Sequence, residues 1–284
     1  MIEVIGIRYC RLGTADLEGS VEFACNVIGL EEVGQEDDAV YLRGDHRDHN
    51  IVYFRGDPSD HTLGLEVETF EELDAAESTL AGAGFEVSRG TDTEAAARRC
   101  MGFINFCDPT GNPVDLVVRP FHSGRRYFPS RDAGITEFSH VGLKTTDAAR
   151  DEKFWSDYFN IRANDRIGQA ALMSFDEVHH RIALFPTDHS GIQHINFQVE
   201  TIDDIMRSYY FLSERQVAIR FGPGRHPTSG AMFLYYEGPD GMTYEYSSGV
   251  RNVDENWQPR QLPFKDESFC MWGARPNIPE FSDS

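Results

Sequence analysis

The chain has 284 residues, with 26 basic and 47 acidic side chains and a net charge of −21. Nucleic acids and anionic membranes both attract clustered Lys and Arg, so this charge argues against either partner. The sequence contains no apolar run of about 18 residues and no basic segment followed by an apolar one at its start, which predicts neither a membrane span nor a secretory signal. The five cysteines form no CxxC pair, so we expect reduced cytoplasmic thiols and no zinc site built on cysteine.

The first predicted elements recur later in the chain. Residues 12–23 (LGTADLEGSVEF) align with residues 143–154 (LKTTDAARDEKF) at an offset of 131, with Leu, Thr, Asp and Phe coinciding. Two further matches keep nearly that offset: residues 67–69 match residues 199–201, and Pro109-Thr-Gly111 matches Pro239-Asp-Gly241. The repeat predicts two homologous halves of roughly 120 residues each.

Each half divides again into two units that begin in the same way. A threonine, which we expect to cap the helix, precedes each of four helix-like segments that have an acidic first turn: Thr14, Thr69, Thr145 and Thr201. The segments 147–161 and 202–215 carry aromatic residues at helical spacing, and we expect these rings to pack in the core.

Short β-rich runs bounded by turn residues surround the helices. They include residues 39–43, 50–54, 169–174, 180–185, 194–199 and 231–236. Strand, helix and then several strands, four times over, predicts the α+β class, with helices covering one face of each curved sheet.

The composition suggests where these units begin and end. We expect a first domain over residues 1–120, a linker over 121–134, a second domain over 135–250 and a tail over 251–284. The tail is rich in aromatic residues and is expected to pack either on its own domain or on a neighbouring subunit.

The two halves differ at three positions of predicted strands. His140 opens the first strand of the second half, where the first half has Tyr9; His194 opens a later strand, where the first half has Thr62. Glu245, in the last strand, corresponds to Asp115. Two neutral imidazoles and one carboxylate form the facial triad of non-haem Fe(II) oxygenases, so His140, His194 and Glu245 are the candidate metal ligands.

Longer stretches of the second half resemble a known family. Residues 138–144 (FSHVGLK), 179–185 (HHRIALF), 193–197 (QHINF) and 222–246 (GPGRHPTSGAMFLYYEGPDGMTYEY) resemble the type I extradiol catechol dioxygenases of the vicinal oxygen chelate superfamily. The resemblance implies tandem βαβββ modules, two per domain, that form curved mixed sheets around a cup. It also implies that the first half, residues 1–120, has lost its site and is a structural domain without metal, and that residues 135–250 form the catalytic, metal-binding domain.

The resemblance assigns roles residue by residue. It implies that His140, His194 and Glu245 bind the metal and that His180 is the acid–base histidine. His226 and Tyr235 match residues that hydrogen-bond the substrate and oxygen. Thr228 and Ser229 stand where relatives vary, so neither receives a role.

The expected activity is ring cleavage of a catechol-type aromatic by O2. The ligand set suits Fe(II), and Mn(II) could replace it. A histidine with an unperturbed pKa near ~6.5 can accept the catechol proton and return it. Two alternatives stay open: a glyoxalase-like isomerase or lyase of the same superfamily, and a non-catalytic small-molecule binding protein. The family resemblance suggests a homo-oligomer.

Other histidines and cysteines receive plainer interpretations. His179 is expected on the opposite face of a strand from His180, because strand side chains alternate. His46 and His49 are expected in a solvated turn, and Cys100 and Cys107 as buried thiols. No glycine-rich phosphate loop is present in a fitting context, so no nucleotide cofactor is expected.

Overall fold

The computed structural model describes residues 1–36 and 38–281. Strands account for most of its regular structure. In the first half these are β1 (Gly6–Thr14), β2 (Glu31–Glu36), β3 (Ala39–Arg43), β4 (Ile51–Arg55), β5 (His61–Val67), β6 (Val87–Arg89), β7 (Cys100–Cys107) and β8 (Pro113–Pro120). In the second half they are β9 (Ile135–Thr145), β10 (Arg162–Ile167), β11 (Ala170–Ser174), β12 (Ile182–Pro186), β13 (Gly191–Val199), β14 (Ile219–Arg225), β15 (Met232–Glu237), β16 (Thr243–Ser248), β17 (Arg260–Leu262) and β18 (Trp272–Gly273).

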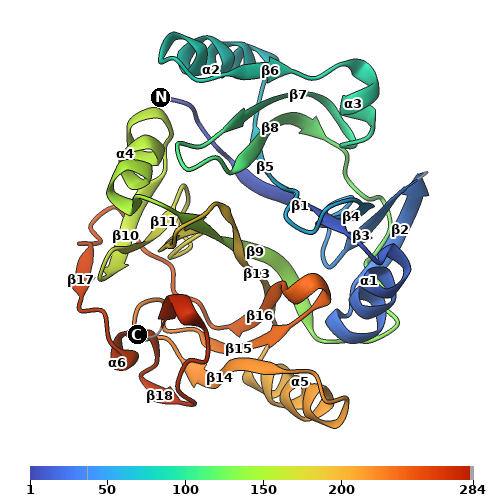
Figure 1. Ribbon diagram of the computed structural model, residues 1–284, viewed down its shortest axis with the longest axis vertical. Coiled ribbons are helices and arrows are strands. Elements are labelled where there is room, and N and C mark those ends of the chain that lie inside the picture. The colour runs from blue at the N-terminus through green and yellow to red at the C-terminus, as the bar shows by residue number, and fades with distance from the viewer. Residues whose placement is uncertain (37, 282–284) are drawn as a thin grey trace.

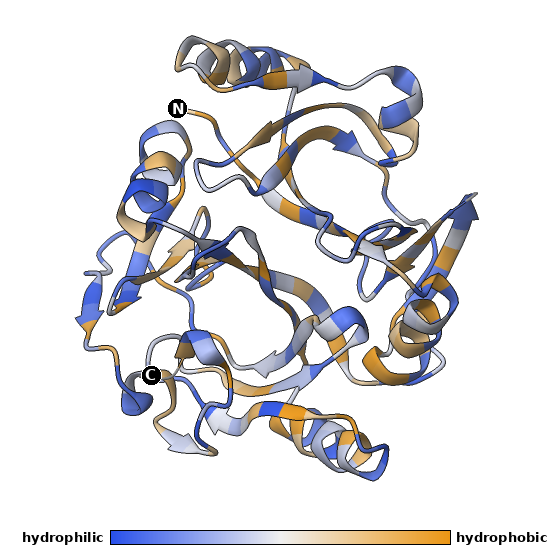
Figure 2. Cartoon of the chain, in the orientation of Figure 1, coloured by the Kyte–Doolittle hydropathy of each residue, from blue (hydrophilic) through white to orange (hydrophobic). Residues whose placement is uncertain are grey.

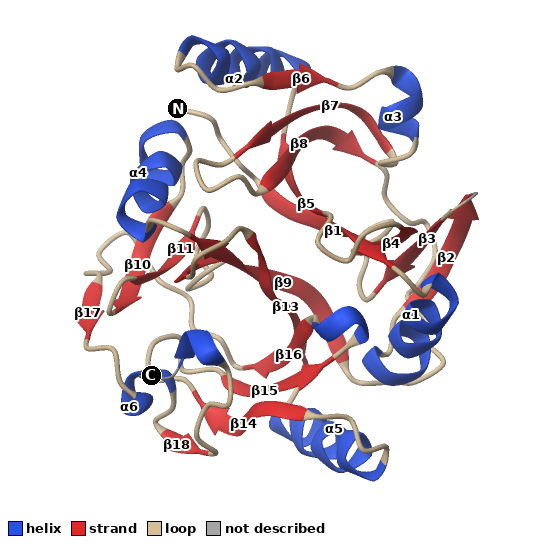
Figure 3. Ribbon diagram, in the orientation of Figure 1, coloured by secondary structure: helices blue, strands red, loops and turns tan. Residues whose placement is uncertain are grey.

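Helices lie on the outside of the strands (Figure 3). They are α1 (Leu17–Phe23), α2 (Phe70–Gly82), α3 (Asp92–Ala96), α4 (Ala148–Tyr158), α5 (Ile202–Glu214) and α6 (Asp266–Phe269), with a π-helical turn η1 (Ala24–Ile28) and 3₁₀ turns η2 (Pro239–Gly241) and η3 (Pro279–Phe281). Helices α2 and α5 mix hydrophilic and hydrophobic residues along their length (Figure 2), as expected for helices with one face against a sheet. Among the described residues, no helix is both long and apolar enough to cross a bilayer.

The strands form two curved mixed sheets, one in each half (Figure 1). The first sheet has the order β2-β3-β4-β1-β5-β8-β7-β6, and the second has the order β17-β10-β11-β12-β9-β13-β16-β15-β14-β18. Each half therefore contains two βαβββ modules joined through antiparallel central strands, β1 with β5 and β9 with β13. The predicted α+β class and the modular fold are confirmed.

One hydrophobic core runs through both halves. Phe106 of β7 contacts the rings of Phe154 and Phe159 from the second half, with centroid distances of 6.2 and 5.9 Å. The hydroxyls of Tyr53 and Tyr244, one from each half, hydrogen-bond to each other. Of the predicted aromatic positions, Phe154 and Phe159 thus pack between the halves, whereas Tyr210 of α5 is exposed, so the expected core position was wrong for that ring.

The helix caps differ in part from the prediction. Thr69 and Thr201 do cap α2 and α5, and each forms a reciprocal capping box. Asp16 and Asp147 cap α1 and α4, so the prediction of Thr14 and Thr145 as caps was wrong. Each of these threonines ends its strand and accepts a hydrogen bond from the backbone N–H of the capping Asp.

The tail packs on the second half of its own chain. Strand β17 pairs with β10, and β18 pairs with β14, so the tail extends both edges of the second sheet. Phe269 and Phe281 lie in a second hydrophobic cluster with Phe185 and Tyr235. Of the two expected positions of the tail, the one on its own domain is therefore confirmed.

Candidate metal centre

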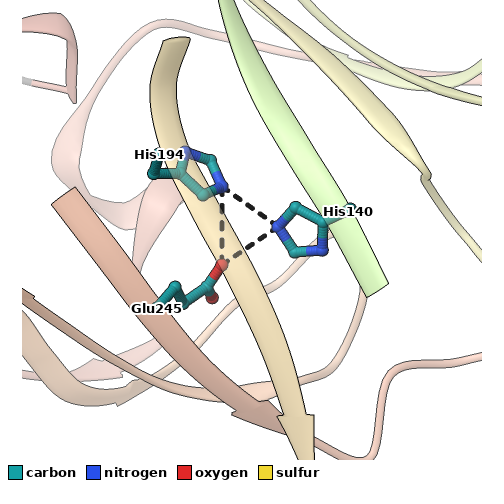
Figure 4. Close-up of side chains that lie close together, drawn as sticks. All are labelled: His140, His194 and Glu245. Atoms are coloured by element: carbon teal, nitrogen blue, oxygen red, sulfur yellow. Dashed lines mark hydrogen bonds and ion pairs between the residues drawn. The ribbon is translucent and has the colours of Figure 1, made fainter. Parts of the chain in front are cut away.

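Three adjacent strands of the second sheet bring His140, His194 and Glu245 together (Figure 4). Nε2 of His140 lies 3.0 Å from Nε2 of His194 and 3.0 Å from Oε2 of Glu245, and Nε2 of His194 lies 3.5 Å from the same oxygen. The histidines sit inside their strands, since β9 begins at Ile135 and β13 at Gly191. Their expected position at strand starts was therefore wrong, although the three side chains do converge.

The converging atoms fit a divalent ion. All three side chains are buried, yet within residues 1–36 and 38–281 no partner makes a well-aligned hydrogen bond to Oε2 of Glu245. Ligand atoms about 2.1 Å from one ion, at right angles to each other, would lie about 3 Å apart. Two imidazole nitrogens and one carboxylate oxygen with this spacing could occupy three positions of an octahedral site and leave the others open.

The surroundings keep the two kinds of ligand in the protonation states that a metal needs. Burial lowers the pKa of His194 to about 3, so the ring is neutral near pH 7. Burial alone would raise the pKa of Glu245, but His140, His226 and His194 together hold it below its usual range. Nδ1 of His194 is hydrogen-bonded to Oε1 of Gln193, which directs the Nε2 lone pair into the site.

A glycine makes room for one of the ligands. Gly142 is the cross-strand neighbour of His194, and a Cβ placed on it would lie 2.5 Å from Nδ1 of that ring. In the first half the equivalent pair is Arg11 with Thr62, where a small side chain faces a large one. The imidazole ring of His194 therefore has room only because residue 142 is a glycine.

The predicted catalytic residues surround the ligands. The ring of His180 lies 4.2 Å from that of His140, and the ring of Tyr235 lies 5.2 Å from that of His194. Nδ1 of His226 donates to the carbonyl of Phe269 at 2.7 Å, and its Nε2 lies 3.2 Å from the Tyr235 hydroxyl. All six candidate residues thus meet in one place.

A small cavity of about 30 Å³ opens beside these residues. His180, His194, His226 and Tyr235 supply its polar wall. The rest of the lining is mainly apolar and includes residues from both the sheet and the tail: Ile167, Ala170, Leu172, Phe185, Thr228, Ser229, Phe269 and Phe281. In chemistry, these walls match an aromatic ring with one polar edge and apolar faces.

His179 does not lie where the sequence predicts. It and His180 belong to a turn that precedes β12, and their Nδ1 atoms are 3.1 Å apart. Strand alternation does not apply in this turn, so the expected opposite orientation was wrong. Nε2 of His179 contacts Oδ2 of Asp165 at 2.9 Å, and sequence reasoning did not single out this buried carboxylate.

Strand register confirms the counterparts in the first half. Tyr9 and Asp115 both pair with Gly64, and in the same arrangement His140 and Glu245 both pair with Asn196. The hydroxyl of Tyr9 donates to Oδ2 of Asp115 at 2.9 Å.

Besides that of His179, two more of the plainer interpretations were wrong. His46 is exposed, as expected, but His49 is buried because its ring stacks on Tyr9 with centroids 5.1 Å apart. Cys100 is buried as expected, whereas Cys107 is exposed at the end of β7.

Comparison with known proteins gives the family. The chain is 27% identical over 272 or more residues to several ring-cleaving enzymes; one is the iron-dependent extradiol dioxygenase of Rhodococcus jostii (strain RHA1), aligned over 96% of this chain and 97% of that protein. It is 28% identical to the manganese-dependent 2,3-dihydroxybiphenyl 1,2-dioxygenase of Geobacillus genomosp. 3, over 90% of this chain and 89% of that protein. The crystal structure of BphC, a halotolerant catechol dioxygenase, superposes with a TM-score of 0.89 over 99% of this chain and 97% of that one, at 21% identity. The sequence model of the Glyoxalase/Bleomycin resistance protein/Dioxygenase superfamily matches residues 6–116 and 137–246, and the chain belongs to that superfamily.

Proposed function

We propose that this protein is an extradiol dioxygenase, which cleaves the ring of a catechol-type aromatic next to its two hydroxyls and adds both atoms of O2. The observation that carries the proposal is the convergence of His140, His194 and Glu245 in a buried site with no such set at the equivalent place in the first half. Relatives aligned over nine-tenths of the chain are named for this activity and support it.

The proposal assigns the metal to the three converging side chains. Fe(II) is the expected ion and Mn(II) the second choice, since the two relatives named above depend on one or the other. When bound there, a divalent ion lowers the pKa of a ligating catechol hydroxyl and holds the substrate in place for reaction.

The chain's own residues then move protons and orient the substrate. Burial, followed by the neighbouring histidines, lowers the pKa of His180 well below its usual range, so the ring is neutral and can accept a proton. Burial also raises the pKa of Tyr235, which keeps its hydroxyl protonated as a hydrogen-bond donor. His226, held by the carbonyl of Phe269, orients that hydroxyl.

The remaining parts of the proposal concern the whole protein. Residues 1–120 are proposed to be structural, and residues 121–134 to be the linker. Residues 135–250 are proposed to bind the metal, and the tail, residues 251–284, to supply part of the cavity wall. The protein is proposed to act in the cytoplasm as a homo-oligomer. Size-exclusion chromatography with light scattering tests the oligomer.

The two alternatives make different demands on the site. A glyoxalase-like site with ligands from both halves would need ligands at Tyr9 and Thr62, which are poor ligands for a divalent ion. A binding protein would not need the buried triad at all. Neither alternative accounts for His140, His194 and Glu245 together.

Oxygen-dependent ring cleavage tests the proposal directly. Protein purified and loaded with Fe(II) without air is mixed with a panel of catechols in air, and the yellow ring-opened product is recorded with oxygen uptake. We expect His194→Ala to lose bound metal, and His180→Ala to keep metal but lose turnover by about 10²–10⁴-fold.

His49→Ala is the matched control, because His49 occupies in the first half the position that His180 occupies in the second. This variant should retain turnover. Iron-loaded protein that opens no catechol would favour the alternatives, and normal turnover by His180→Ala would refute its acid–base role.

A further inference from the structure

A chain of three buried side chains leads away from the metal site. Oδ2 of Asp165 lies 2.9 Å from Nε2 of His179, and Nδ1 of His179 lies 3.1 Å from Nδ1 of His180. Asp165 and His179 are fully buried, and His180 is 7% exposed. Neither Asp165 nor His179 lines the cavity, so any influence on the reaction passes through His180.

The direction of each hydrogen bond follows from the chemistry of the groups. Burial opposes ionisation of Asp165, but its bonds to His179 and Arg260 outweigh this and lower its pKa, so the carboxylate can only accept. Nε2 of His179 must therefore carry a proton. Burial lowers the pKa of His179, so the ring is neutral near pH 7 and its Nδ1 is an acceptor. The partner atom, Nδ1 of His180, must then be the donor.

This direction leaves His180 with one specific tautomer. A neutral imidazole carries one proton, and that proton is used at Nδ1. Nε2 of His180 is then the unprotonated atom on the ring that lines the cavity. A proton acceptor for the substrate needs that free lone pair.

The tail holds the far end of the chain in place. The backbone N–H and Nε of Arg260 both donate to Oδ1 of Asp165, at 3.0 Å each. Trp257 packs edge-on against the ring of His179, with centroids 6.0 Å apart, and its indole N–H donates to the carbonyl of Asn164 at 2.8 Å. These contacts fix both Asp165 and His179.

The first half lacks this arrangement although it keeps the terminal histidine. Strand register places Gly34 opposite Tyr41, as Asp165 is opposite Leu172, so Gly34 is the counterpart of Asp165. Asp48 occupies the place of His179 and contacts Nδ1 of His49 directly, at 3.2 Å. The Asp–His pair behind the histidine is thus present only in the half that has the metal ligands.

We propose that Asp165 and His179 are positioning residues that keep the proton of neutral His180 on Nδ1, so that Nε2 is ready to accept the proton of a catechol hydroxyl. This inference rests on the proposed function, in which His180 is the base. In that step the hydroxyl O–H bond breaks, its electron pair stays on oxygen, and a new N–H bond forms at Nε2. The imidazolium still donates through Nδ1 to His179 and later returns the Nε2 proton to an oxygen of the product.

The tautomers can be observed directly. Long-range ¹H–¹⁵N correlation spectra of the full chain, labelled with ¹⁵N-histidine and loaded with diamagnetic Zn(II), report which nitrogen of each ring carries the proton. We expect Nε2–H for His179 and Nδ1–H for His180. A proton on Nε2 of His180 would overturn the proposal whatever the variants do.

Asp165→Asn should reverse the direction of the hydrogen bonds that link residues 165, 179 and 180. Arg260 donates to Oδ1 through its backbone N–H and Nε, and to Oδ2 through Nη2. With the amide oxygen at Oδ1, two of these three bonds remain and the NH2 group can donate to Nε2 of His179, which then carries its proton on Nδ1. The opposite amide orientation keeps only one bond from Arg260, so we expect the first. His180 becomes an acceptor at Nδ1 and loses the Nε2 lone pair. We expect kcat to fall about 100-fold with a plain catechol while KM and bound Fe(II) stay close to wild type.

Substrate acidity separates positioning from a general structural defect. A nitrocatechol, whose hydroxyl ionises readily without a base, should lose less than about tenfold in kcat in Asp165→Asn. Asp176→Asn is the matched control, because Asp176 lies in the same turn and contacts Arg181 but not the histidines, and it should behave as wild type with both substrates. Equal losses with both substrates would overturn the proposal. A wild-type enzyme that opens no catechol would instead count against the proposed function, since the tautomer spectra do not depend on turnover.

Discussion

The two halves place different side chains at the same point of the same fold. In the second half, two imidazoles and Glu245 converge and could hold a divalent ion. In the first half, Tyr9 donates to Asp115, and Nε of Arg98 lies 2.6 Å from the same carboxylate oxygen. Asn105, the counterpart of Tyr235, donates to the other oxygen at 2.8 Å. A buried carboxylate needs a compensating positive charge, and the first half supplies it from its own chain.

The largest expected difference between the halves concerns metal binding. Glu245→Gln keeps the shape of the side chain but removes its charge, and we expect metal affinity to fall more than about 100-fold, because even outer hydrogen-bond partners of ligands are worth roughly 10–100-fold. Ring cleavage should disappear with the metal. Asp115→Asn, the same change in the first half, should alter neither bound metal nor turnover. Metal analysis after dialysis and oxygen uptake measure both, and a comparable metal loss in Asp115→Asn would show that the first half contributes to the site.

The first half should respond in stability instead. Arg98→Met leaves Asp115, which is fully buried, without its cation, and we expect the free energy of unfolding to fall by about 3–5 kcal/mol. Urea denaturation of the metal-free protein measures this change. Adding Asp115→Asn to the same chain should recover part of the loss. A loss below about 1 kcal/mol in Arg98→Met would mean that the pair behaves like a surface ion pair.

A smaller effect should follow from the space beside His194. Gly142→Ala places a methyl group against the ring and should weaken metal binding by roughly 10–100-fold, as loss of ligand orientation does. Gly82→Ala, where no atom lies within 4 Å of the added carbon, is the control and should bind metal normally. Unchanged metal affinity in Gly142→Ala would show that the ring can shift without cost.

The smallest effect concerns acid stability of the first half. Burial alone would raise the pKa of Asp48. The contacts with His49 and Arg99 have the larger effect and lower this pKa to about 2. The unfolded value is about 3.9, so the ionised group stabilises the fold above pH ~4 and this contribution is lost as the pH falls from about 4 to 2. Asp48→Asn should therefore lose stability less steeply with acid than wild type in that window. Urea denaturation at pH 5, 4 and 3 checks the slopes, and equal slopes would contradict the assignment.

Sequence reasoning found the triad because the repeat offered an internal comparison. His140, His194 and Glu245 stand where the other half has Tyr9, Thr62 and Asp115, of which only the carboxylate is a common metal ligand, and strand register confirms the equivalence. The six predicted strands all appear, with ends shifted by a few residues, because apolar alternation is a local signal.

The incorrect or missed predictions concern contacts that the local sequence does not determine. Nothing local to Asp165 or His179 indicates that a turn and a tail strand will bring them together. His49 looks like a loop residue, but the rings of Tyr9 and Tyr41 pack against it, and Tyr9 lies far away in the sequence. The caps at Asp16 and Asp147 were missed because Thr and Asp both suit the position and the end of the strand decides between them.

The shared core makes the second half depend on the first for its folding. Phe106 of the first half covers Phe154 and Phe159 of the second, and Tyr53 satisfies the hydroxyl of Tyr244. If the second half were expressed alone, these rings would be exposed to solvent, and we expect the fragment to fold poorly and to aggregate. The second half therefore needs the first as cover for its core, although the side chains that converge at the candidate metal centre come from the second half alone.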